Sequence, residues 1–366
     1  MLQLEHSIKE IYNNLAISLR NIVDEKEKLI NGINEKIKDI TSENKDFQID
    51  FIDIEQPYKS AFIAKNENEK ILLPDNLGSG YNVLVAFALF SYIAEKEKTP
   101  IVLIIDEPEL HLHSDWQKKM YNVFSTQGNL QIVYSTHSSH FVKPNLVENV
   151  FKFENTTSEG IKILPKKEDQ EKVRKIKDNF LNLEVCEIFF AQKVLCVEGK
   201  TDLNSFQKYL LNIGVNFSDW IIVKMNSKDE AKKFWNFLKC FGLEFKIVLD
   251  LDALFGKQKN REDIESETNT FKNFFETESI KDKIISLGKC CEKNKIKEER
   301  CSPLFNENLN KDEIKIKNEI LEELKEKNVF ILQQGMLENY LDKNGEIVED
   351  KKEEKDKELK NIFNLI

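Results

Sequence analysis

The sequence predicts an α/β protein of two successive domains, the second of which has a parallel sheet with a helical insertion. Short apolar runs that are typical of buried strands alternate with helical segments in both halves of the chain. Several of these runs end directly in acidic residues, as at Asp106 and Asp250. Ligands of open α/β sheets bind outside the carboxyl ends of the strands, so these acidic residues are the first candidates for function.

The composition narrows the class of protein. A chain of 366 residues is long enough for two domains, and 40% hydrophobic with 32% charged residues is typical of a soluble globular protein. The net charge of −10 argues against a generally basic nucleic-acid binder, so any nucleic-acid contact must use a local patch. The six cysteines form no C-x-x-C pair, and no signal peptide opens the chain, so we expect a cytoplasmic protein without structural zinc.

The run Ile101–Ile105 is the most informative stretch of the first half. Its five apolar residues predict a strand buried on both faces, and Pro108 ends any further pairing. Asp106 could hold a magnesium ion through water, and Glu107 could orient or deprotonate an attacking water, which is the layout of a Walker B strand. The alternative is an ordinary core strand that ends in a solvated acidic turn.

Two further motifs flank this strand. Gly78-Ser79-Gly80 precedes the apolar helix expected over Val83–Ala94, where glycines allow close approach to a phosphate and a serine can cap the helix. The next strand, expected over Gln131–Ser135, is followed by His137, which could hydrogen-bond a γ-phosphate. These motifs resemble the signature loop and the switch histidine of ABC-type ATPases. A glycine-containing helix start and a structural histidine remain the alternatives.

The second half places three acidic residues after buried strands. Glu198 follows the apolar run Val194–Val197, and Asp250 and Asp252 follow Phe245–Leu249. We expect these carboxylates to converge at one sheet edge, where oxygen ligands suit Mg²⁺ or Mn²⁺ and two such ions could clamp a phosphodiester. The order of a glutamate-glycine turn and an Asp-x-Asp resembles the Toprim pattern. The alternative is a set of solvated strand ends.

The sequence contains no Walker A motif. Gly199-Lys200-Thr201 looks like the end of a P-loop, but position 194, where that motif requires a glycine, is a valine. The backbone cradle and the lysine that hold the β- and γ-phosphates are therefore missing from this sequence.

Taken together, these stretches resemble the overcoming lysogenization defect (OLD) family of ATP-dependent nucleases, and the chain is also similar to the ATPase-nuclease subunit of Gabija phage defence. The matching stretches are Leu77–Tyr81, Ile101–His113, Ser135–Ser139, Ile188–Asp202, Val248–Asp252 and Gly335–Tyr340. The resemblance implies a metal-dependent DNA endonuclease coupled to an ABC-type ATPase, with Mg²⁺ or Mn²⁺ and ATP as cofactors and a role in defence against phage.

The resemblance also implies roles for single residues and partners. Asp202 and Glu338 would join Glu198, Asp250 and Asp252 as metal ligands, and Lys228 would act as a basic group near the scissile phosphate. It further implies a homodimer or higher oligomer formed through the ATPase head. Because the family carries a Walker A segment, we expect either that this chain is the C-terminal piece of a longer or split protein, in which another polypeptide can supply that segment, or that it is a divergent form that has lost ATP hydrolysis.

The predicted organisation has five parts: a helical arm over 1–46, the C-terminal half of an ABC-type ATPase domain over 47–165, a linker helix over 166–192, a Toprim domain over 193–345 with an insertion at about 256–325, and a charged tail over 346–366, either helical or disordered. The alternative function is a non-cleaving, ATP-sensing or SMC-like regulatory module that binds nucleic acid or a partner.

Overall fold

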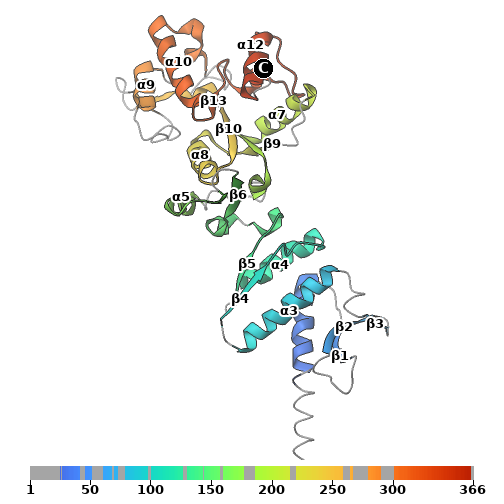
Figure 1. Cartoon of the computed structure of the whole chain (residues 1–366). Coiled ribbons are helices and arrows are strands. Elements are labelled where there is room, and N and C mark those ends of the chain that lie inside the picture. Colours follow the sequence, from blue (N-terminus) through green and yellow to red (C-terminus); the bar gives the residue numbers. More distant parts are fainter. Residues whose placement is uncertain are drawn as a thin grey trace, which may run out of the picture. The chain divides into compact units, whose positions relative to one another are not determined.

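The chain forms two compact units, Met1–Phe141 and Val142–Ile366, which we call unit one and unit two (Figure 1). The computed structural model describes residues 25, 27–41, 46–51, 61–67, 70–72, 79–97, 100–126, 130–142, 144–156, 160–176, 186–214, 220–258, 264–266, 279–289 and 301–363. Within these residues, no helix combines the length and the apolar character that crossing a membrane requires.

Unit one begins, in its described part, with a helix over residues 27–41. An antiparallel sheet of order β1-β2-β3 follows, built from Asp46–Phe51, Ala61–Glu67 and Lys70–Leu72. The long helix α3, Ser79–Glu97, then packs on the first helix, with Ile33, Ile37 and Phe47 buried against Ala88. Gly32 makes this contact possible, because a Cβ atom there would lie 2.2 Å from the ring of Tyr92. The described part of the predicted arm is therefore one helix that runs through Gly32.

The parallel strands of unit one are β4, Ile101–Ile105, and β5, Leu130–Tyr134, which are joined by α4, Ser114–Thr126. The short helix η2, Ser139–Phe141, closes the unit. The prediction that β4 is buried on both faces is wrong. Val102 and Ile104 are 59% and 78% exposed, and Val133, which pairs with Ile104, is 51% exposed. Side chains alternate along a strand, and those on the other face of β4, namely Ile101, Leu103 and Ile105, are partly buried.

Unit two is organised around a four-stranded sheet of order β13-β10-β8-β9, in which every pair is parallel. The strands are β8, Lys193–Val197; β9, Trp220–Lys224; β10, Glu244–Leu249; and β13, Val329–Ile331. The two central strands, β8 and β10, are buried along nearly their whole length, as expected for a parallel sheet that is covered on both faces.

Helices cover both faces of this sheet (Figure 1). Alternate strand residues divide between two cores: Cys196 and Ile247 share one with residues of α8, Ala231–Cys240, whereas Leu195 and Val248 share the other with residues of α7, Lys200–Asn212. Short helices η8, Lys228–Glu230, and η9, Leu251–Leu254, follow β9 and β10. The sheet therefore presents the carboxyl ends of its strands at one edge between two helical layers.

A hairpin and four short helices of unit two precede the sheet in the described residues. The hairpin β6–β7, Lys152–Thr156 and Gly160–Leu164, was assigned from the sequence to the ATPase-like part, but it lies in unit two. Its Leu164 and Glu154 pack beside Gly242, which has a φ of +61°. The helices η3, η4, α5 and η6 span Pro144–Asn149, Lys167–Asp169, Gln170–Ile176 and Glu187–Phe190.

The described part of the predicted helical insertion contains strands as well as helices. It contains a small antiparallel pair and helices, namely β11, Gly256–Gln258; β12, Ile264–Ser266; α9, Ser279–Leu287; η11, Ser302–Leu304; η12, Asn306–Asn308; and α10, Lys311–Lys325. Lys317 of α10 is fully buried, and its ammonium group donates to the carbonyl of Leu304 and to Asn306 Oδ1. This hydrogen-bonded cation ties α10 to the short helices η11 and η12 that precede it within the insertion.

The segment predicted as a charged tail is an integral part of unit two. It contains α12, Lys352–Ile362, whose Leu359 and Ile362 are buried in the same core as α7, together with Phe363. The ring of Phe363 lies edge-on to the ring of Trp220, and the buried ammonium group of Lys246 donates to the carbonyl of Ile362. The apolar residues at the end of α12 are spaced three and four residues apart among many charged ones, so little in the sequence indicated this buried face.

We expect Leu359→Ala to lower the free energy of unfolding of unit two by about 2–5 kcal/mol, because Leu359 is 0% exposed and its loss leaves a cavity. Lys357→Ala, an exposed position on the same helix, should change it by less than about 0.5 kcal/mol. Denaturant unfolding followed by tryptophan fluorescence measures both. Equal effects of the two substitutions would show that α12 does not stabilise the unit.

Candidate functional site

Three carboxylates meet at the carboxyl edge of the sheet in unit two. Glu198 follows β8, Asp250 follows β10, and Asp252 lies in η9. One oxygen from each lies within 4.8 Å of the others. The structure thus brings together the three residues that the strand ends singled out.

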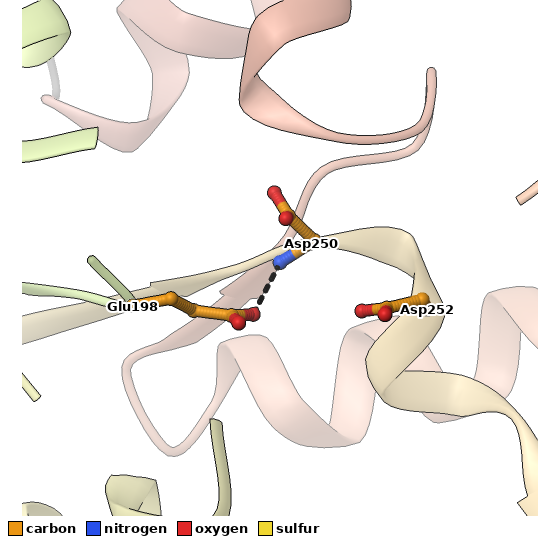
Figure 2. A group of neighbouring side chains, drawn as sticks. All are labelled: Glu198, Asp250 and Asp252. Atoms are coloured by element: carbon orange, nitrogen blue, oxygen red, sulfur yellow. Dashed lines mark hydrogen bonds between the residues drawn. The ribbon is translucent and has the colours of Figure 1, made fainter. Parts of the chain in front are cut away.

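The local geometry differs from the prediction in one respect. Asp250 and Asp252 were expected on one face of a continuing strand, but β10 ends at Leu249 and the backbone turns into η9. The backbone N–H of Asp250 donates to Glu198 Oε1 at 3.0 Å, and the carboxylates of Glu198 and Asp252 point toward each other (Figure 2). Asp250 Oδ1 accepts from the backbone N–H of Leu337 at 2.9 Å. Backbone groups therefore orient two of the three carboxylates.

Burial and mutual repulsion shape the protonation of this cluster. Burial raises the pKa of Glu198 from its ordinary 4.5 to about 7, and Asp252 contributes in the same direction. Burial likewise raises the pKa of Asp250 from 3.8 to about 8, with further contributions from Glu198, Asp202 and Asp252. Lys228 is the nearby cation, with its Nζ atom 2.9 Å from Asp252 Oδ2. One ammonium group balances only part of this negative charge.

The donor set fits a divalent cation. All of its ligand atoms are carboxylate oxygens, which Mg²⁺ and Mn²⁺ prefer. Asp252 Oδ1 is buried and has no hydrogen-bond partner, although buried polar atoms are nearly always paired. A cation bound there would satisfy this oxygen and offset the repulsion between the carboxylates.

Two further residues that the family resemblance suggested as ligands lie outside the three-carboxylate group. Asp202 Oδ2 accepts from the backbone N–H of Gly199 at 2.8 Å, so it caps the start of α7. Glu338 is exposed in the first turn of the short helix α11, Leu337–Tyr340. Neither belongs to the compact cluster around Glu198 in this structure.

Cys301 is a neighbour of the cluster that sequence reasoning missed. Its thiol is fully buried and accepts from the backbone N–H of Asp252. Burial, with contributions from Asp252 and Asp250, raises the pKa of this thiol to about 12, so it remains protonated at neutral pH. The distance of about fifty residues between Cys301 and Asp252 along the chain left no sequence signal for this contact.

Unit one holds the second set of predicted residues, at the ends of β4 and β5. Because Ile105 pairs with Tyr134, Asp106 and Ser135 come next to each other. The Ser135 hydroxyl donates to Asp106 Oδ1 and accepts from the backbone N–H of Glu107 at 3.1 Å. Ser135 thus joins the two strand ends, a role that the sequence analysis did not assign.

His137 lies at the same edge. Its Nε2 atom is 3.4 Å from Glu107 Oε1, and its backbone N–H donates to Glu109. Glu107 has a φ of +47°, a left-handed conformation that is costly for a residue with a side chain. The strained backbone turns Glu107 toward His137, so the predicted base and the predicted switch histidine are neighbours.

The proposed signature loop is described only in part. Gly78 lies outside the described residues, and Ser79 is the first residue of α3. Gly80 is buried, and a Cβ atom there would lie 2.6 Å from the carbonyl oxygen of His111. The glycine is therefore required for the close approach of α3 to the turn after β4, whatever else it does.

Comparisons with known proteins identify two domains. Residues 1–142 match the family model of the AAA ATPase domain, and residues 189–252 match the TOPRIM domain of overcoming lysogenization defect protein-like sequences. The first match spans the same residues as unit one to within one position, and the second spans β8 through the first turn of η9.

Two curated relatives carry the same family name. The Old nuclease of Escherichia phage P2 is 24% identical over 276 residues, which cover 68% of this chain and 46% of the relative. The OLD nuclease of Thermus scotoductus is 26% identical over 161 residues, covering 42% of this chain and 30% of the relative. The chain thus spans less than half the length of either relative.

Solved structures show a remote likeness to the head domains of Smc proteins. The Smc head with a coiled coil and joint from Pyrococcus yayanosii is 16% identical with a TM-score of 0.35, covering 47% of this chain and 33% of that one. The extended Smc head of Pyrococcus furiosus, bound to the C-terminal domain of ScpA, is 16% identical with a TM-score of 0.34, covering 43% and 40%. TM-scores this low support no conclusion about fold or function.

The chain therefore joins an AAA-type ATPase domain to a TOPRIM domain with an acidic site at the carboxyl edge of its sheet. This pair of domain matches, with the two nuclease relatives, makes the chain similar to proteins of the overcoming lysogenization defect family. Domains of these two classes bind nucleotides and divalent metal ions.

The raised pKa values predict how the stability of the metal-free protein depends on pH. Folded Asp250 and Glu198 keep their protons up to about pH 8 and 7, whereas the unfolded chain releases them near 3.8 and 4.5. Between these limits the folded state binds more protons, so the free energy of unfolding should fall as the pH rises from about 4 to about 8.

Asp250→Asn should remove the larger part of this fall, and Asp282→Asn, an exposed position in α9, should leave it unchanged. Denaturant unfolding in the presence of a chelator, repeated across this pH range, measures the effect. A stability that stays flat or rises in wild type over the same range would contradict the assignment.

Proposed function

We propose that this protein is a metal-dependent endonuclease that hydrolyses phosphodiester bonds of DNA and is coupled to its ATPase domain. The observation that carries the proposal is the cluster of Glu198, Asp250 and Asp252 with the orphaned buried oxygen of Asp252. The TOPRIM match and the nuclease relatives support the same reading.

Each residue of the cluster has a distinct part in this proposal. Glu198, Asp250 and Asp252 hold Mg²⁺ or Mn²⁺, as two ions in the form we favour, which neutralises charge on the phosphate and activates water. Lys228, 2.9 Å from Asp252 in the structure, binds a phosphate oxygen when the carboxylates are engaged elsewhere. Asp202 contributes negative charge next to Glu198 and Asp250, and Glu338 joins as an outer ligand if its side chain turns inward.

In unit one we propose that Asp106 binds magnesium, Glu107 orients the attacking water and His137 contacts the γ-phosphate of ATP. The short contact between Ser135 and Asp106, and the proximity of His137 to Glu107, support this assignment. Gly78, Ser79 and Gly80 would form the signature loop that closes over nucleotide held by another protomer. The proposal therefore includes a homodimer or higher oligomer, and a polypeptide that supplies the absent Walker A motif.

The cellular setting belongs to the proposal as well. We propose a cytoplasmic protein that acts in defence against phage or other foreign DNA, as the resemblance of the sequence to its family implies. The similarity to the ATPase-nuclease subunit of Gabija stays a prediction of the sequence analysis.

The first test concerns the nuclease. Asp250→Ala should reduce cleavage of plasmid DNA in Mg²⁺ or Mn²⁺ by about a hundredfold or more, because losing a ligand should cost at least as much as losing a supporting residue. Asp282→Ala provides the control, since that carboxylate is exposed in α9. A folded Asp250→Ala protein that cleaves DNA as wild type does would contradict the assignment of Asp250 as a metal ligand of the nuclease. Wild-type protein that binds DNA but never nicks it in any metal would favour the non-cleaving regulatory module.

The second test concerns ATP. Without the phosphate cradle and lysine of a Walker A motif, the purified chain should bind ATP weakly and hydrolyse it negligibly. Hydrolysis should appear when a polypeptide with that motif is added, and Glu107→Gln should remove it, whereas Glu35→Gln, at an exposed position of the first helix, should not. Phosphate release measures the rate. Robust hydrolysis by the chain alone, lost in Glu107→Gln, would contradict our view of the nucleotide site.

A further inference from the structure

The turn over residues 333–336, which we call the metal-site turn, connects β13 to α11 and touches the acidic cluster. The carbonyl of Gly335 accepts from the backbone N–H of Leu251, the residue between two of the carboxylates. Directly after the turn, the N–H of Leu337 donates to Asp250 Oδ1 at 2.9 Å, in a buried hydrogen bond. The position of this turn therefore decides how the Asp250 carboxylate is oriented.

Two side chains, the buried Tyr340 and the half-buried Glu358, form hydrogen bonds with the turn. The N–H of Gln333 donates to Glu358 Oε1 at 2.9 Å, and the N–H of Gln334 donates to the Tyr340 hydroxyl at 2.8 Å. The same hydroxyl donates to Glu358 Oε2 at 2.6 Å. One carboxylate and one phenol thus satisfy two consecutive backbone donors of the turn and also bond to each other.

Burial makes the hydrogen bonds of the Tyr340 hydroxyl costly to lose. Tyr340 is 0% exposed, and burial raises the pKa of the Glu358 carboxyl. A buried polar group that loses its partners costs more than the hydrogen bonds contributed, so a shift of Gln334 that left the Tyr340 hydroxyl with fewer partners would be costly. Gln334 adds a further tie to α12 through Glu354, at 3.2 Å.

We propose that Tyr340 and Glu358 are positioning residues of the metal site. They fix the metal-site turn, the turn fixes the N–H of Leu337, and that N–H fixes the Asp250 carboxylate. The C-terminal helix α12 thereby controls metal affinity without contacting the metal. The inference rests on the proposed function, because it assumes that Asp250 binds a divalent cation.

Unit two offers a matched control. Tyr209 of α7 is a second buried phenol, and its hydroxyl donates to Asp356 Oδ1 of the same helix α12 at 3.3 Å. This pair has the same chemistry and joins the same helix to the sheet layer. Neither of its members has a hydrogen bond to the metal-site turn in the described structure.

The experiment compares Tyr340→Phe and Glu358→Gln with Tyr209→Phe and Asp356→Asn in the full chain. Manganese binding is measured by electron paramagnetic resonance. Tyr340→Phe, which leaves the net charge unchanged, should raise the Kd for Mn²⁺ about tenfold, as losses of supporting hydrogen bonds typically do, and Glu358→Gln should act in the same direction. The two control variants should bind Mn²⁺ within about twofold of wild type, below that range.

Hydrogen exchange read by mass spectrometry gives a second, metal-free readout. Peptides that cover residues 333–337 should exchange faster in Tyr340→Phe than in Tyr209→Phe. If Tyr340→Phe destabilises the protein like the control yet leaves Mn²⁺ affinity and this exchange unchanged, the inference is overturned. If wild type binds no Mn²⁺, the proposed metal site fails, and the exchange experiment still decides whether the pair holds the turn.

Discussion

The burial of three neighbouring carboxylates at one sheet edge is the constraint on which the acidic site of unit two depends. Glu198, Asp250 and Asp252 each place an oxygen within 4.8 Å of the others in a largely buried site, where like charges are costly. Burial, with a further contribution from this repulsion, raises the pKa of Asp250 to about 8. A flexible scaffold would relax by separating the groups, so the site persists only because the backbone around it is held rigidly.

The rigidity comes from the sheet and from hydrogen bonds to the strand ends. The central strands β8 and β10 pair in parallel and are buried on both faces, so the positions of Glu198 and Asp250 follow from strand register. Backbone N–H groups then bind the carboxylates themselves, from Asp250 to Glu198 and from Leu337 to Asp250. Lys228 supplies the nearby positive charge at Asp252. The remaining imbalance is what a divalent cation would neutralise.

Sequence reasoning located the acidic site because strands, unlike loops, leave a periodic signal. Apolar runs that end in acidic residues identified Glu198 and Asp250, and the order of the strands predicted that their ends would meet. Sequence reasoning did not predict the features that depend on packing between distant parts of the chain. The exposed face of β4 and the packing of α12 are two such cases, since an apolar run does not reveal what covers it and a charged helix hides its apolar stripe. Cys301 and Glu358 reach the region of the site from distant parts of the chain, for which the sequence offers no pattern.

The two candidate sites differ in how many of the groups that hold their side chains in place come from the same unit. In unit two the carboxylates follow the strands of one sheet and accept hydrogen bonds from the backbone of Asp250 and Leu337, so the site is built within one compact unit. In unit one Asp106, Glu107 and His137 lie at the ends of two strands, joined mainly by Ser135 and by a strained turn at Glu107. The sequence provides no phosphate cradle beside them, so their alignment toward a triphosphate depends on groups from elsewhere. The acidic site is therefore preformed within unit two, whereas the candidate nucleotide site of unit one needs completion.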